Sequence, residues 1–259
     1  MALDTQRKGF LNNNTQLGQS SVGNEGVQRI LAVDDNTYTL RIVELALEKA
    51  GFDVMTATSG QDALNVIRRN GLPHLAIVDI NMPIMDGFDF ARAVHQFSDL
   101  PIIMLTAVNE EEKIVNSIEE FAEDYIIKPF SPSELVARAR RVLNRMGDFS
   151  YTLDPLTRVD ERLQIDFSNR KAVVNDKAIN LTPTETKLLY VLMRNAGQVV
   201  TTDFLLRRLW PMEEAFEDRL HVHVHRLRRK IEEVPSKPRY VVSERGMGYS
   251  FPPSQEIPK

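Results

Sequence analysis

Short apolar runs that end in polar residues, separated by segments of helical spacing, constrain the fold of the first half of this chain. The runs are residues 30–33 before Asp34, residues 75–78 before Asp79, and residues 102–105 before Thr106. Such runs alternating with helical segments are typical of βαβ units, in which helices cover both faces of a parallel sheet. With two more strands expected at residues 52–57 and 125–127, residues 27–146 are predicted to form a doubly wound α/β domain of five parallel strands and five helices.

The second half of the chain has a different pattern. Residues 147–160 show no sustained period and are interpreted as a linker, whereas apolar alternation from residue 163 to residue 174 predicts small antiparallel strands. Three helices are then expected, the first opened by the capping-box sequence Thr182–Glu185 and the last spanning about residues 218–233. A β-hairpin is expected near the C-terminus. Three helices followed by a hairpin are typical of a winged helix-turn-helix, so residues 161–255 are predicted to form an α+β domain of that kind.

Composition narrows the class of protein. The chain has 259 residues, 42% of them apolar, which is enough for two cores. It contains no cysteine, which excludes disulfides, a thiol nucleophile and cysteine-ligated zinc. Residues 1–26 are rich in Asn, Gln, Ser and Gly and are expected to form a flexible tail. No apolar run approaches the ~18 residues of a membrane span, so a soluble cytoplasmic protein without membrane contact is expected.

Charge is distributed unevenly between the two halves. Residues 1–149 hold 14 Lys and Arg against 21 Asp and Glu, a net charge of −7, whereas residues 150–259 hold 18 against 15, a net charge of +3. An acidic domain joined to a basic one suggests two separate tasks, and nucleic acid is a natural partner for the basic domain.

Polar residues gather at one predicted edge of the parallel sheet. Asp34, Asp35 and Asp79 follow strands at their carboxyl ends, where open α/β sheets bind ligands. Three converging carboxylates repel one another unless a cation neutralises them, and Mg²⁺ prefers such oxygen ligands. Thr106 and Lys128 end two further strands and supply the hydroxyl and the cation that an incoming phosphoryl group requires. The set therefore predicts attack of an Asp carboxylate on phosphorus with the help of Mg²⁺.

Four strings in residues 27–146 resemble the receiver domain of two-component response regulators: ILAVDD, IVDINMPIMDG, IIMLTA and DYIIKPF. The resemblance implies a flavodoxin-like sheet and a phospho-acceptor at Asp79. It also implies the following further roles: Mg²⁺ ligation by Asp35, Asp79 and the Asn81 carbonyl, with Asp34 acting through water; phosphate binding by Lys128 and Thr106; a switch aromatic at Tyr125; and a cis peptide bond before Pro129.

A strongly basic segment lies between residues 219 and 230, with five Arg or Lys, three His and no acid. At helical spacing, Leu220, Val224, Leu227 and Ile231 form one apolar stripe. Arg226, Arg229 and His225 project away from the stripe, while Arg219, His223 and Lys230 lie along one flank. An amphipathic helix with a cationic outer face, placed after a short helix and a turn, fits insertion into the major groove of double-stranded DNA.

Residues 161–252 resemble the OmpR/PhoB type of winged-helix domain through LTPTETKLLYVLMRNAGQVVTTDFLLRRLW, VHVHRLRRKIE, PRYV and RGMGYSF. The resemblance implies base reading by Arg226, phosphate contacts by His223 and Arg228, and minor-groove entry by Arg245. His221 and His225 depart from the usual residues, so the DNA sequence does not follow by analogy. Alternating histidines on a strand could bind a metal. The helical spacing of the apolar stripe argues against that interpretation. The same histidines instead predict that DNA affinity rises as the pH falls through ~6.5.

The same family resemblance implies a dimer face in the receiver domain. The matching residues are the apolar Val115, Ile118 and Val136 and the ion pairs Glu119–Arg140 and Asp124–Arg138, which would form between subunits. A third pair lacks its usual Arg, because Ile114 stands in that position. We therefore expect phosphorylation to favour a homodimer, weaker than is usual in this family.

These observations predict a transcription regulator, not an enzyme, that is phosphorylated at Asp79 by a histidine kinase and binds promoter DNA, with RNA polymerase as a further candidate partner. Two alternatives remain open. One is a Mg²⁺-dependent phosphatase or phosphotransferase of the haloacid dehalogenase type, which would carry its nucleophile in an Asp-x-Asp sequence on the first strand; here the acceptor is on the third. The other is a constitutive DNA-binding protein with a vestigial receiver.

Overall fold

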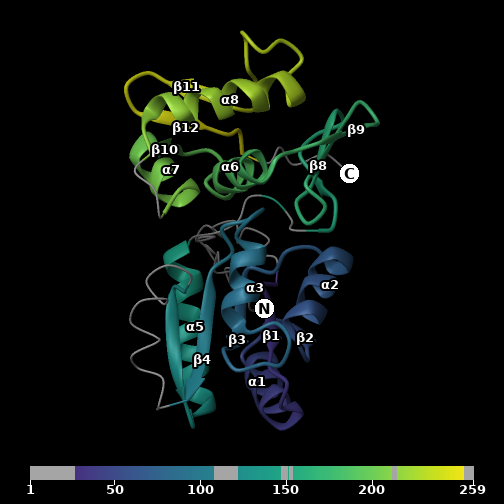
Figure 1. The fold of residues 1–259 in the computed structure, drawn as a ribbon, viewed down its shortest axis with the longest axis vertical. Coiled ribbons are helices and arrows are strands. Elements are labelled where there is room, and N and C mark those ends of the chain that lie inside the picture. The colour runs from purple at the N-terminus through teal and green to yellow at the C-terminus, as the bar shows by residue number, and fades with distance from the viewer. Residues whose placement is uncertain (1–26, 108–121, 147–150, 152–153, 212–214, 254–259) are drawn as a thin grey trace, which may run out of the picture.

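The computed structural model describes residues 27–107, 122–146, 151, 154–211 and 215–253, which form two folded domains (Figure 1). In the first domain five parallel strands are ordered β2-β1-β3-β4-β5, as predicted. The elements are β1 (Arg29–Val33), α1 (Thr37–Lys49), β2 (Asp53–Ala57), α2 (Gly60–Asn70), β3 (Leu75–Asp79), α3 (Gly87–Val94), β4 (Ile102–Ala107), β5 (Asp124–Lys128) and α5 (Pro132–Met146). The fifth predicted helix, between β4 and β5, lies outside the described residues.

Two apolar layers cover the sheet, one on each face, because successive side chains of a strand point to opposite faces. In β1, Ile30 packs with residues of α1 and α5, whereas its neighbour Leu31 packs with residues of α2 and α3. All five residues of β3 are buried, as expected of a central strand in a doubly wound sheet. The continuous apolar runs in the sequence therefore reflect burial on both faces.

The second domain is built around three helices, α6 (Pro183–Arg194), α7 (Thr202–Leu209) and α8 (Glu217–Ile231). Thr182 caps α6 through the predicted capping box with Glu185. An antiparallel sheet precedes the helices, and a three-stranded sheet in the order β10-β12-β11 contains the C-terminal hairpin. The strands are β6 (Thr157–Arg158), β7 (Leu163–Asp166), β8 (Lys171–Val174), β9 (Lys177–Asn180), β10 (Val199–Thr201), β11 (Val242–Glu244) and β12 (Gly248–Ser250). We call the β11–β12 hairpin the wing.

The segment expected to be a linker, residues 147–160, is shorter than predicted. Thr157–Arg158 form β6, which pairs with β7. Tyr151 is buried, and its hydroxyl donates to the carbonyl of Pro252. These residues therefore pack with the second domain. A two-residue strand has no measurable period, which is why the sequence pattern did not indicate it.

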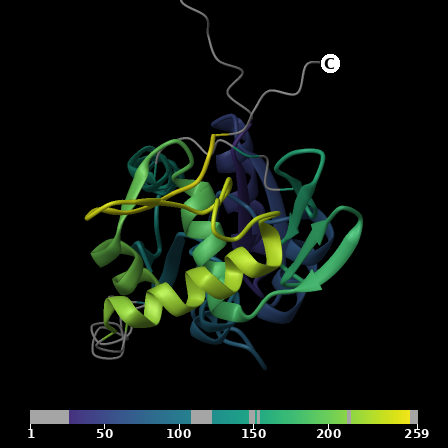
Figure 2. The ribbon, with the colours of Figure 1, turned by 90° about the horizontal axis from the view of Figure 1, so that it is seen from above.

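The second domain contacts the first domain at the amino ends of the parallel strands (Figure 1). Arg208 of α7 pairs with Asp99 at 3.4 Å and with Glu123 at 3.3 Å, and these acids precede β4 and β5. Helix α8 lies on the side remote from the first domain, as the view from above shows (Figure 2). Among the helices in the described part of the chain, none is long and apolar enough to cross a membrane.

Candidate functional site

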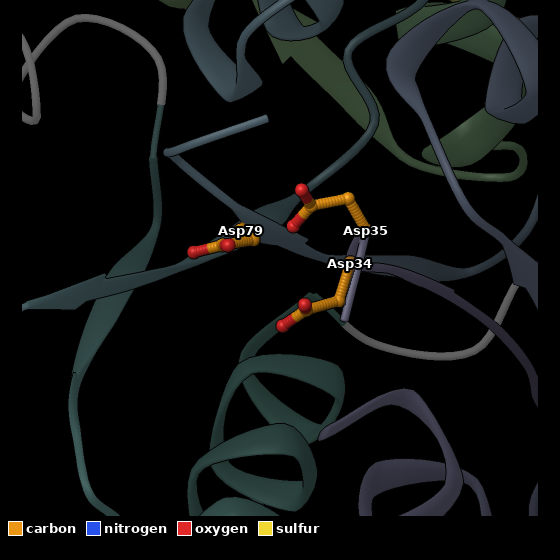
Figure 3. Close-up of side chains that lie close together, drawn as sticks. All are labelled: Asp34, Asp35 and Asp79. Atoms are coloured by element: carbon orange, nitrogen blue, oxygen red, sulfur yellow. The ribbon is translucent and has the colours of Figure 1, made fainter. Parts of the chain in front are cut away.

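Three carboxylates meet at the carboxyl end of the parallel sheet (Figure 3). Asp34 and Asp35 follow β1, and Asp79 ends the neighbouring β3. Each of them offers an oxygen, and these oxygens all lie within 4.8 Å of one another. Asp34 and Asp79 are buried, whereas Asp35 is exposed. The convergence that the sequence predicted at this edge is therefore present.

Lys128, at the end of β5, joins the two buried carboxylates. Its Nζ lies 2.7 Å from Asp34 Oδ2 and 3.0 Å from Asp79 Oδ1. Burial raises the pKa of Asp79 above its ordinary value, although the hydrogen bond and charge of Lys128 oppose this shift. Burial alone would lower the pKa of Lys128, but the two carboxylates outweigh it and the pKa is raised. The amine therefore remains charged beside the carboxylate that is the candidate acceptor.

Thr106 and Tyr125 lie on the two neighbouring strands β4 and β5. Thr106 is the second-last residue of β4 and is fully buried. Its Oγ1 donates to the carbonyl of Ala107 at 3.2 Å. Tyr125 on the adjacent β5 is 43% exposed. The Lys128–Pro129 peptide bond is cis, as the family resemblance implied.

The Met85-Asp86-Gly87 sequence brings α3 close to Asp79. Asp86 caps α3 by accepting from the amide of Asp89 at 2.7 Å. A Cβ at Gly87 would lie 2.5 Å from the backbone carbonyl oxygen of Asp79. Only glycine therefore allows the first turn of α3 to approach β3 this closely.

The donor set fits Mg²⁺. Three carboxylates within reach of one another are the hard oxygen ligands that this ion prefers, and their mutual repulsion favours a divalent cation. The backbone N–H of Asn81 donates to the Asp79 carboxylate. That contact holds the Asp79 carboxylate in place at the start of the loop that also carries the Asn81 carbonyl.

Helix α8 presents a basic, exposed face. Its buried stripe is Leu220, Val224, Leu227 and Ile231, as the helical spacing predicted. The side chains of Arg219, His221, His225, Arg226 and Arg229 are exposed. Arg245 is exposed at the turn of the wing, between β11 and β12. The helix and the wing tip thus offer cations from two separate elements.

The remaining basic residues of α8 are partly buried and already bound within the domain. The guanidinium of Arg228 donates to the carbonyl of Val241 and to Ser243 Oγ. Lys230 Nζ donates to Glu185 Oε2 at 2.6 Å and to the carbonyl of Asn180 at 3.0 Å.

A ring cluster lies near the start of α8. Arg219 stacks over the Trp210 ring at 4.6 Å, and the ring of His223 lies 5.4 Å from the same tryptophan. Burial lowers the pKa of His223, and the charges of Arg226 and Arg219 lower it further. The lowered pKa makes His223 a weaker contributor to the predicted rise of DNA affinity on acidification.

The predicted dimer face is only partly described. Val115, Ile118 and Glu119 lie outside the described residues. Arg138 pairs with Asp124 at 3.2 Å within the same chain, and Arg141 joins it at 2.6 Å. Val136 is half-buried, and Arg140 donates to the carbonyl of Ala50. Exchange of the Asp124–Arg138 pair between subunits stays a prediction.

Two buried acids beside α8 make contacts that the sequence pattern did not indicate. Glu185 was recognised only as a capping residue, yet it also binds Lys230. Glu232, at the C-terminal end of α8, accepts from three backbone amides of the segment that leads to β11. An acid that directly follows a basic helix is the one signal in the sequence that could have pointed to Glu232.

Comparisons with known proteins agree with both halves of this description. Residues 30–140 match the family model "Response regulator receiver domain", and residues 176–251 match "Transcriptional regulatory protein, C terminal". The chain is 39% identical over 227 residues to the DNA-binding response regulator MtrA of Mycobacterium leprae, covering 87% of this chain and 99% of that protein. It is 36% identical over 239 residues to the probable transcriptional regulator ycf27 of Galdieria sulphuraria, covering 90% and 93%. Among solved structures, DrrB of Thermotoga maritima, described as an OmpR/PhoB homologue, matches at 30% identity over 88% of this chain and 100% of that one, with a TM-score of 0.43.

Proposed function

Because the chain belongs to the OmpR/PhoB family of two-component response regulators, we propose that Asp79 accepts a phosphoryl group from a histidine kinase and that this modification favours dimerisation and promoter binding. The protein is a DNA-binding transcription regulator that is controlled through its receiver domain, and it is not an enzyme. The observation that carries the proposal is the buried Asp79 carboxylate held beside Lys128 among two further carboxylates.

The residues at the sheet edge divide the work of phosphoryl transfer. Asp79 is the nucleophile: one of its oxygens forms the new bond to phosphorus while the bond to the donor breaks. Lys128 and Thr106 are placed to bind the oxygens of the transferred group, one by charge and one by hydrogen bond. Asp34, Asp35, Asp79 and the Asn81 carbonyl would hold Mg²⁺, which when bound supplies charge neutralisation for the phosphoryl oxygens.

The proposed signal must travel across the receiver domain. Asp79 lies at the carboxyl ends of the strands, whereas Arg208 of the second domain contacts acids at the amino ends. A phosphoryl group carries about −1.5 to −2 charges, which replace the single negative charge of the Asp79 carboxylate, and it attracts Thr106 and Lys128. Movement of Thr106 would vacate space for the exposed Tyr125 ring on the adjacent strand, and this rearrangement would bias the surface formed by β5 and α5 toward dimerisation.

DNA contact is assigned to the exposed face of α8 and to the wing tip. Arg226 would read bases in the major groove, with Arg219, His221, His225 and Arg229 beside it, and Arg245 would enter the minor groove. His223, Arg228 and Lys230 contribute less in this proposal, because each is partly buried and Arg228 and Lys230 are already bound within the domain. Two copies of α8 in a dimer would then occupy two half-sites.

The test uses the full chain incubated with Mg²⁺ and acetyl phosphate as the phosphoryl donor. Peptide mass mapping is expected to place the added phosphoryl group on Asp79, and light scattering is expected to detect dimers in the same sample. Asp53→Asn, an exposed acid on β2, serves as the matched control and should behave like wild type. Phosphorylation elsewhere, or a wild-type chain that stays monomeric when fully modified, would overturn the corresponding part of the proposal. Sustained release of phosphate from small phosphoesters would favour the phosphatase alternative.

A further inference from the structure

Two side chains at the C-terminal end of α8 bind the segment that leads into the wing. The segment runs from Arg239 to Ser243 and includes the start of β11. Arg228 and Glu232 are spaced by four residues, so they lie on the same side of the helix, one turn apart. One side chain is a cation with several donors, and the other is an anion that only accepts.

Arg228 binds the acceptors of this segment. Its Nε and Nη2 lie 2.8 Å and 2.6 Å from the carbonyl oxygen of Val241, and Nη2 also lies 2.8 Å from Ser243 Oγ. Its guanidinium carbon sits 5.9 Å from the ring centre of Tyr249 on β12. The one side chain therefore contacts both strands of the wing.

Glu232 binds the donors of the same segment. Its Oε2 accepts from the amide of Arg239 at 2.8 Å, and its Oε1 accepts from the amides of Tyr240 and Val241 at 2.9 and 2.8 Å. The residue is 7% exposed, so these contacts are shielded from water. Hydrogen bonds to a charged group in such a place are stronger than those between neutral groups.

We propose that Arg228 and Glu232 are positioning residues that hold the wing in a fixed orientation on α8. Arg245 at the wing tip and Arg226 on α8 can then contact the same DNA site at a fixed spacing. The inference rests on the proposed DNA contacts of Arg226 and Arg245. It gives Arg228 a different task from the phosphate contact that the family resemblance implied. It also gives a role in DNA recognition to an acid, which cannot bind phosphate itself.

The test measures how tightly the full chain and its conservative variants bind an operator fragment of wild-type sequence, at a series of salt concentrations. Arg228→Lys keeps the positive charge but loses the planar fork, and we expect affinity to fall on the order of tenfold. Glu232→Gln is expected to weaken binding similarly. Arg158→Lys, on β6, and Glu233→Gln, next to Glu232, are the controls, because both residues are exposed and neither is assigned to DNA contact, so neither should weaken binding.

Each substitution has an outcome that contradicts the clamp. If Arg228 acted only as a point charge toward a phosphate, Lys would serve as well and Arg228→Lys would bind like wild type. If Glu232 were only a nearby charge, Glu232→Gln would tighten binding, as removal of an anion near DNA should, and would match Glu233→Gln. Because the clamp acts through the wing, Arg228→Lys combined with Arg245→Ala should bind no more weakly than the weaker single variant. Additive losses would overturn the proposal.

Amide hydrogen exchange tests the clamp without DNA. In Glu232→Gln the amides of residues 239–241 should exchange faster, while those of α6 should keep their wild-type rates and so confirm that the domain is folded. Unchanged exchange at residues 239–241 would overturn the clamp. If Arg245→Ala bound DNA like wild type while this exchange still accelerated, the proposed wing contact would fail and the clamp would stand as a contact of the free protein.

Discussion

Loss of the Lys230 amine is expected to destabilise the second domain far more than loss of a typical surface lysine. Lys230 Nζ lies 2.6 Å from Glu185 Oε2, and the Glu185 side chain is 1% exposed. Removing one partner of a buried ion pair costs about 3–5 kcal/mol, because the other charge is left uncompensated. Here Thr182 still donates its amide to Glu185, and Lys230 is itself 28% exposed, so water can partly replace it. For Lys230→Met we expect a loss of about 2–3 kcal/mol in the free energy of unfolding.

The assay is urea unfolding followed by tryptophan fluorescence. The chain has one tryptophan, Trp210, which is buried in the second domain and so reports on that domain alone. With a typical urea slope, the expected loss moves the midpoint down by about 1 M. Lys237→Met removes an exposed lysine and should change stability by less than ~0.5 kcal/mol. Equal effects of the two substitutions would refute the reasoning.

The pH dependence provides a second check on the same pair. Burial alone would raise the pKa of Glu185, but the hydrogen bonds from Lys230 and Thr182 outweigh burial and the pKa lies below its ordinary value. The unfolded chain therefore binds a proton first on acidification. The contribution of Glu185 to stability is present above pH ~4.5 and is lost as the pH falls below that value. In Lys230→Met this loss on acidification should be smaller, because burial then raises the pKa of Glu185 with less opposition.

Three further outcomes are expected. Burial, with smaller contributions from nearby arginines, lowers the pKa of His74 to about 4. The free energy of unfolding should therefore fall by up to about 3 kcal/mol as the pH falls from 6.5 to 4. His74→Asn should reduce this pH dependence in thermal unfolding, and an unchanged pH dependence would contradict the prediction. Asp35→Asn should weaken Mg²⁺ binding at least tenfold in a calorimetric titration, whereas the exposed control Asp53→Asn should not. Arg226→Ala should cost about 1–3 kcal/mol of DNA binding and relax preference at one base position; uniform weakening on all sequences would instead indicate a phosphate contact.

The parallel sheet and its acidic edge were predictable from the sequence for a simple physical reason. A strand buried on both faces must be continuously apolar, and the carboxyl ends of parallel strands meet at one edge. Asp34 and Asp79 were therefore expected at the same edge once residues 30–33 and 75–78 were recognised as strands, and the pairing of β1 with β3 brings them together. The buried stripe of α8 followed equally from helical spacing.

Other features could not be predicted from the sequence pattern. Helical spacing gives the direction in which Arg228 and Lys230 leave α8, but long side chains can bend back to backbone carbonyls or a buried acid, as both do here. The tasks of Glu185 and Glu232 depend on which segments pack beside them, and that is set by tertiary structure. Arg138 likewise pairs with Asp124 of its own chain, whereas the family resemblance implied that this pair forms between subunits.

The central claim is that modification of Asp79 at one end of the receiver controls DNA binding by the other domain. The most direct measurement is the affinity of the full chain for an operator fragment before and after phosphorylation, with Asp79→Ala treated in the same way. Coupling between two such sites typically changes affinity roughly 5–150-fold. We expect tightening in this range for wild type and none for Asp79→Ala, which should bind like the unmodified chain. Equal affinity of the modified and unmodified wild-type chains would contradict the account and favour a constitutive DNA-binding protein.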